Sequence, residues 1–177
     1  MTDFPILPAT AGDGPAIESL LDDAFGLDRR LKTSYRLRER EEPAEGLSFV
    51  ARAGDGSLAG AVSLWHLRIG PHGAPALLLG PLAVSPRHQS KGLGLKLMGK
   101  GISEARARGH GLIILVGDAP YYAKMGFVQV PEGQMLMPGP VDPRRLLALE
   151  LKPGALAAAR GLILSPSRFS GSRATSR

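Results

Sequence analysis

Cysteine is absent from this chain of 177 residues. Its absence excludes a disulfide scaffold, cysteine-ligated zinc and a cysteine nucleophile, and it agrees with the reducing interior of a cell. Long apolar runs are absent too, because no segment approaches the roughly 18 apolar residues that a membrane-spanning helix requires. We therefore expect a cytoplasmic protein with no membrane partner and no metal site.

The start of the chain also lacks the features of a secretory signal. Asp3 stands where a signal has basic residues, and Pro5 and Pro8 interrupt the apolar stretch. Aromatic residues are scarce, at 5% of the chain, and no recognised nucleic-acid-binding motif accompanies the net charge of +6. We therefore expect no nucleic acid partner.

The basic charge is concentrated near the C-terminus. Arg168, Arg173 and Arg177 supply three of the six net charges, and no acidic residue accompanies them in the last thirteen residues. Serine and glycine surround these arginines, and such a composition cannot form a core. With 44% apolar residues, the remainder is long enough for one core. We expect one domain over residues 1–168 and a basic flexible tail over residues 169–177.

Hydrophobic periodicity and turn signals divide the domain into strands and helices. Strands are expected over residues 4–7, 47–53, 58–69, 76–84, 112–116, 127–130 and 146–151. Helices are expected to begin near Asp13, Gly92 and Asp118, with a brief helix over residues 153–160. The charged segment 30–45 is either an exposed helix or a mobile segment at a substrate entrance. This order predicts one α/β domain in which helices pack on a mainly antiparallel sheet.

The segment 80–94 carries the clearest chemical signal. An apolar strand ends at Val84, and a short turn leads from it into a helix. The free N–H groups of a first helical turn and the positive end of the helix dipole attract anions. Gly92 and Gly94 lack a Cβ atom, so a phosphate can approach the backbone, and Lys91 adds a positive charge. The turn is not a dinucleotide fingerprint, because Leu97 stands where that motif needs glycine.

These residues resemble the signature of the GNAT superfamily of N-acetyltransferases. Residues 89–94 match its pattern Gln/Arg-x-x-Gly-x-Gly/Ala, and Tyr122 precedes the Gly126-Phe127 pair as in its second hallmark. Residues 80–84, 117–122 and 149–156 are similar to a bacterial subfamily of predicted acetyltransferases, so the resemblance covers the chain except its tail. It implies a twisted central sheet, mixed and mainly antiparallel, with helices on both faces and two parallel central strands that splay apart.

The resemblance also implies the parts of a site. The main chain of Leu82, Ala83 and Val84 would pair with the pantetheine arm of acetyl-coenzyme A, and Tyr122 would protonate the departing coenzyme A thiolate. The pyrophosphate would bind at the turn formed by Gln89, Ser90, Lys91, Gly92, Leu93 and Gly94. Arg87 and His88 are candidates for contacts with the adenine or the ribose phosphate.

The function implied is direct transfer of an acetyl group to a primary amine in a ternary complex, with a small molecule or a protein as acceptor. The alternative is a module of the same fold that binds acyl-coenzyme A without turnover. The chain is expected to be a monomer or a homodimer. Asp118 is expected to cap a helix rather than to touch the amine. The general base stays open among His66, water and four glutamates, which are Glu39, Glu41, Glu42 and Glu45.

Overall fold

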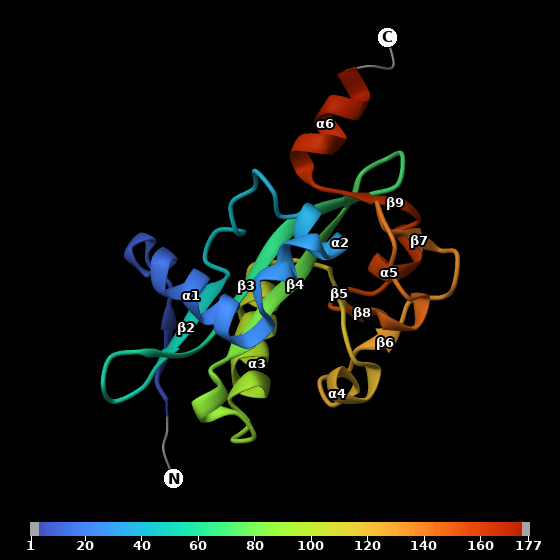
Figure 1. Cartoon of the computed structure of the whole chain (residues 1–177). Coiled ribbons are helices and arrows are strands. Elements are labelled where there is room, and N and C mark those ends of the chain that lie inside the picture. The colour runs from blue at the N-terminus through green and yellow to red at the C-terminus, as the bar shows by residue number, and fades with distance from the viewer. Residues whose placement is uncertain (1–3, 175–177) are drawn as a thin grey trace.

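Residues 4–174 are described by a computed structural model, in which helices pack on a mixed sheet (Figure 1). The strands are β1 (Ile6–Pro8), β2 (Ser48–Arg52), β3 (Leu58–Ile69), β4 (Ala74–Val84), β5 (Leu112–Val116), β6 (Val128–Gln129), β7 (Met135–Leu136), β8 (Leu146–Glu150) and β9 (Gly161–Leu164). The α-helices are α1 (Gly14–Phe25), α2 (Thr33–Arg36), α3 (Leu93–Ala107), α4 (Ala119–Ala123), α5 (Ala155–Ala158) and α6 (Pro166–Ala174). Short 3-10 helices are η1 (Ala11–Asp13), η2 (Leu27–Leu31), η3 (Pro86–His88) and η4 (Pro143–Arg145).

The sheet is mainly antiparallel. Its strands run in the order β1-β2-β3-β4-β5-β8-β6, and β9 joins β7 to the end of β3. Within the described part of the chain, only the pairs β4–β5 and β7–β9 are parallel. The fold class predicted from the sequence is therefore confirmed.

Helices cover both faces of the sheet. Successive side chains of a strand point to opposite faces. Phe49 of β2 belongs to the core cluster of Leu97 and Met98 from α3, whereas the next residue, Val50, packs with Leu20 of α1. The two long helices α1 and α3 therefore bury opposite faces of the same strands.

The parallel strands β4 and β5 separate soon after they meet. Their pairing is confined to Leu77 with Ile113 and Leu78 with Ile114, although β4 continues to Val84. Figure 1 shows the two chains diverging from there, one toward α3 and the other toward α4. The predicted splayed pair is therefore confirmed, and the separation leaves one edge of β4 without a strand partner among the described residues.

The largest departure from the predicted elements is α6, which extends beyond the sheet at the C-terminal end (Figure 1). Its composition does not favour a helix, but tertiary contacts hold its first turns. The carboxylate of Glu41 accepts hydrogen bonds from the N–H (3.1 Å) and hydroxyl of Ser167. A Cβ atom on Gly73 would lie 2.5 Å from the Phe169 ring, so this ring packs on the β3–β4 turn.

The predicted domain end at residue 168 falls inside α6, and Arg177 lies outside the described residues. The hydrogen bonds of Ser167 to Glu41 and the contact of the Phe169 ring with Gly73 do not involve residues 170–177. Removing residues 170–177 is therefore expected to shift the melting temperature by less than about 2 °C. The control Phe169→Ala is expected to lower it by about 3 °C or more, because the ring contact is lost. Thermal unfolding followed by circular dichroism measures both; an equal loss in the truncated chain would contradict the prediction.

No helix among residues 4–174 is long and apolar enough to cross a bilayer.

Candidate active site

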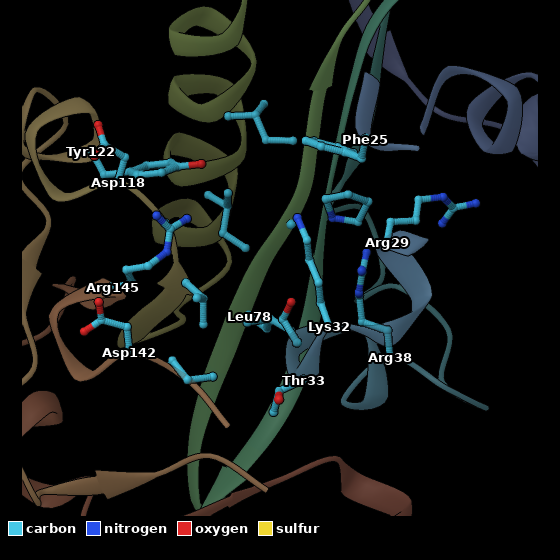
Figure 2. A pocket seen from close by; sticks show the side chains of 18 of the residues that line it. Phe25, Arg29, Lys32, Thr33, Arg38, Leu78, Asp118, Tyr122, Asp142 and Arg145 are labelled. Atoms are coloured by element: carbon cyan, nitrogen blue, oxygen red, sulfur yellow. The ribbon is translucent and has the colours of Figure 1, made fainter. Parts of the chain in front are cut away.

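A cavity of about 640 Å³ lies where β4 and β5 separate. Figure 2 shows Tyr122, Asp118 and Arg145 on one wall and Lys32 and Arg38 on the opposite wall, with β4 between them. The complete lining is Phe25, Arg29, Lys32, Thr33, Ser34, Arg38, Leu78, Leu79, Gly80, Pro81, Leu82, Val116, Gly117, Asp118, Tyr121, Tyr122, Pro140, Val141, Asp142 and Arg145. Segments far apart in the sequence therefore meet around one space.

A bulge in β4 shapes the floor of this cavity. Val62 and Leu64 of β3 pair with Leu82 and Leu79 of β4, which leaves the two residues 80–81 unpaired in the ladder. The indole N–H of Trp65 donates a hydrogen bond of 2.6 Å to the carbonyl oxygen of the first of them. The bulge is thereby held against β3, and its residues form part of the cavity lining.

The predicted pantetheine segment follows the bulge. Leu82, Ala83 and Val84 pair with β3 along one edge only. Leu82 lines the cavity, and the side chain of Ala83 is buried on the α1 face. The other edge of this segment has no strand partner among the described residues, because the pairing of β4 with β5 is confined to Leu77 and Leu78.

The predicted pyrophosphate turn begins with four exposed residues, Gln89, Ser90, Lys91 and Gly92. Gly92 occupies the N-cap position of α3 with φ of 77°, and no side chain caps the helix there. The region around a Cβ atom at Gly92 is open, with nothing within 4 Å. The side-chain amide of Gln89 donates to the carbonyl oxygen of Val84 at 3.4 Å, which links the turn to β4. The first N–H groups of α3 therefore have neither a side-chain cap nor bulk in front of them.

The last two residues of this motif point into the protein. Leu93 is buried in the core. A Cβ atom on Gly94 would lie only 2.6 Å from the hydroxyl oxygen of Tyr121. Sequence reasoning explained Gly94 by the approach of a phosphate, but a side chain there would also displace the Tyr121 hydroxyl, even without a ligand. Leu93 and Gly94 can offer a ligand only their backbone groups.

Tyr121 and Tyr122 both line the cavity from α4. The ring of Tyr122 packs edge-on against Tyr121 and Phe127, with centroid distances of 5.0 Å and 6.0 Å. Burial raises the pKa of Tyr122, and the nearby Tyr121 raises it further, while Arg145 acts in the opposite direction. Tyr122 is therefore protonated at neutral pH, which is the state that a proton donor requires.

The carboxylates at the cavity are Asp118 and Asp142, and neither was among the candidates for the general base. Asp118 occupies the expected N-cap position of α4, but its side chain makes no capping hydrogen bond there. It is exposed and lines the cavity, as does Asp142. The glutamates of the segment 39–45 and His66 do not line it. Neither Asp142 nor Arg145 belongs to a local motif, and only the tertiary fold reveals them.

Two of the charged side chains at the cavity are already paired. Arg29 donates to Glu18 at 2.5 Å and to Asp22 at 3.0 Å. Asp142 accepts from Arg144 at 3.0 Å. Across the described ranges, no cluster of three or more histidine, cysteine or acidic side chains is placed to hold a metal ion.

The sequence model of the acetyltransferase (GNAT) family matches residues 15–127, so the chain belongs to this family. The resemblance inferred from the motifs is confirmed. The uncharacterized N-acetyltransferase YjhQ of Escherichia coli (strain K12) is 31% identical over 117 residues, which span 65% of this chain and 64% of that relative. The match therefore covers slightly less than two thirds of the relative's length.

Solved structures agree on the fold. The GNAT family N-acetyltransferase YhbS from Escherichia coli, in complex with CoA, has a TM-score of 0.79 at 24% identity, with 96% of both chains covered. A GNAT family acetyltransferase from Brucella melitensis, in complex with acetyl-CoA, has a TM-score of 0.61 at 25% identity. That match covers 83% of this chain and 96% of the Brucella chain.

Proposed function

We propose that this chain transfers an acetyl group from acetyl-coenzyme A to a primary amine, by direct attack within a ternary complex. One observation carries the proposal: the free edge of β4 and the protonated Tyr122 border the same cavity. The uncapped start of α3 is linked to that edge through Gln89 and Val84. The relatives solved with CoA or acetyl-CoA support this cofactor for the chain.

The residues present fit coenzyme A. The turn over residues 89–94 offers free backbone donors, the positive end of the α3 dipole and the charge of Lys91 to a pyrophosphate. Gly92 leaves the approach open. Leu82, Ala83 and Val84 offer their unpaired edge to the pantetheine arm, which would lie beside β4 like an added strand.

Bound acetyl-coenzyme A supplies an acetyl group activated as a thioester. The bulge residues and Leu82 line the cavity, and we assign to the N–H of Leu82 the polarisation of the thioester carbonyl. The carboxylate of Asp118 attracts the incoming ammonium, which loses a proton to water before attack. As the nitrogen–carbon bond formed and the carbon–sulfur bond broke, Tyr122 would give its proton to the sulfur. The second proton of the acylated nitrogen would leave through water and restore the phenol of Tyr122.

An acceptor-panel assay that detects the free thiol of coenzyme A tests this function. The panel comprises free amino acids, aminoglycosides, polyamines and a peptide with a free α-amine. We expect release that depends on at least one acceptor and rises above the hydrolysis rate without acceptor. Tight binding of acetyl-coenzyme A in calorimetry, with no release across the panel, would contradict the proposal and favour the module that binds acyl-coenzyme A without turnover.

A further inference from the structure

Arg38 is a cation of the cavity wall without a counter-ion. No carboxylate among residues 4–174 lies within ion-pair distance of its guanidinium, and its buried Nε has no hydrogen-bond partner. Burial lowers the pKa of Arg38 to about 10, so the side chain still carries its charge at neutral pH. Arg38 is half-buried, and a charge that is partly removed from water without a counter-ion is costly, so natural proteins usually pair it.

Two aromatic rings hold this guanidinium in place. Its central carbon lies 5.3 Å from the ring centroid of Tyr35 and 5.9 Å from that of Trp65. The faces of such rings attract a cation, but they leave the N–H groups at the edge of the guanidinium unsatisfied. Trp65 is itself fixed by its hydrogen bond to the β4 bulge. The arrangement therefore presents a positioned fork of donors at the cavity.

Two further cations, Arg29 and Lys32, line the same wall and could compete with Arg38 for an anion. Arg29 is occupied by Glu18 and Asp22. Lys32 also lines the cavity and is exposed, so it adds positive charge near Arg38 without an ion pair. Asp118 lies across the cavity beside Tyr122 (Figure 2). The cavity is thus cationic on the wall of Lys32 and Arg38, whereas the wall of the proposed proton donor carries both a carboxylate, Asp118, and a cation, Arg145.

We propose that Arg38, assisted by Lys32, binds an anionic group of the acceptor, so that the substrate is an amine that also carries a carboxylate or phosphate. This inference rests on the proposed acetyl transfer. A guanidinium fork matches such groups with two parallel hydrogen bonds. The anion is not a phosphate of coenzyme A, because no residue of the pyrophosphate turn 89–94 lines this cavity. A polycationic amine would meet the charges of Arg38 and Lys32 and be repelled.

Matched acceptors test the proposal through turnover. The pairs are an α-amino acid with its carboxamide and O-phosphoethanolamine with ethanolamine, and spermidine represents the polycations. We expect kcat/KM to be at least about 10-fold higher for the anionic member of the preferred pair. Arg38→Gln is expected to raise KM for that acceptor by about 10- to 100-fold, while KM for acetyl-coenzyme A stays unchanged.

Arg36→Gln is the matched control, because Arg36 is exposed at the end of α2, two residues before Arg38, and does not line the cavity. It is expected to behave like the wild type with every acceptor. Equal or higher kcat/KM for the neutral and cationic amines would overturn the proposal. An equal effect of Arg38→Gln on both members of a pair would overturn it too.

Trp65 provides a second measurement that does not need turnover. It is the single tryptophan of the chain, and Arg38 lies over its ring. Succinate or inorganic phosphate is titrated at constant ionic strength while the fluorescence of Trp65 is measured. We expect a saturable change in fluorescence in the wild type and in Arg36→Gln, and no such change in Arg38→Gln. Choline chloride should have no such effect.

The two measurements separate the two proposals. Saturable anion binding without acetyl transfer to any amine would contradict the proposed function and retain the anion site at Arg38. Turnover without saturable binding of either anion to the wild type would contradict the anion site and retain the acetyltransferase. Circular dichroism of Arg38→Gln establishes that the variant is folded before either result is interpreted.

Discussion

Replacing Tyr122 by phenylalanine is expected to lower kcat by about one to three orders of magnitude. The ring keeps its contacts with Tyr121 and Phe127, so only the proton on the hydroxyl is removed. The affinity for acetyl-coenzyme A and the melting temperature should change little. Steady-state kinetics with chemistry rate-limiting, together with calorimetry, measure the separate effects.

Tyr121→Phe is the matched control, because Tyr121 lines the same cavity from the neighbouring position. Its hydroxyl approaches the backbone at Gly94 in α3, which favours a packing role. We expect kcat in this variant to stay within about 3-fold of the wild type, below the range of general-acid catalysis. Unchanged turnover in Tyr122→Phe with a large loss in Tyr121→Phe would transfer the proton-donor role to Tyr121.

Gly92→Glu is expected to weaken the binding of acetyl-coenzyme A by about 100-fold or more, because it places a negative charge where the pyrophosphate should bind. The space around a Cβ atom at Gly92 is open, so the new side chain meets no protein atom within 4 Å of that position. The protein should therefore remain folded. Isothermal titration calorimetry measures the affinity.

Gly92→Ala separates charge from backbone strain. The φ of 77° at Gly92 costs any residue with a Cβ atom about 1 to 2 kcal/mol, so both variants carry this penalty. Only the glutamate adds the repulsion of an anion. Affinity in Gly92→Ala is expected to stay within about 10-fold of the wild type. Equal affinities in Gly92→Glu and the wild type would refute the placement of the pyrophosphate.

The boundaries of the central strands followed from the sequence because local signals agree there. The predicted strands 58–69 and 112–116 coincide with β3 and β5. Turn residues bracket each of them, and apolar residues fill the interval. By contrast, α6 was missed, because its composition favours a coil and its contacts with Glu41 and Gly73 come from distant parts of the chain.

The proposed site of the cofactor pyrophosphate could be predicted from the sequence, whereas the surroundings of the acceptor amine could not. The pyrophosphate turn is a strand, a turn and a helix within about a dozen consecutive residues, so its backbone geometry is encoded locally. Asp118 shows the limit of this reasoning, because its residue type suits an N-cap, but its side chain lines the cavity instead.

The sequence by itself determined the family and the turn that we assign to the pyrophosphate, since both depend on neighbours along the chain, and the splayed sheet followed only from the family resemblance. Only the tertiary structure decided what surrounds the acceptor. Arg38, Asp118 and Arg145 come from three separate segments, and the sheet brings them to one cavity. The sequence also could not show that Arg38 lacks a counter-ion, because the carboxylates near an arginine are set by the tertiary fold.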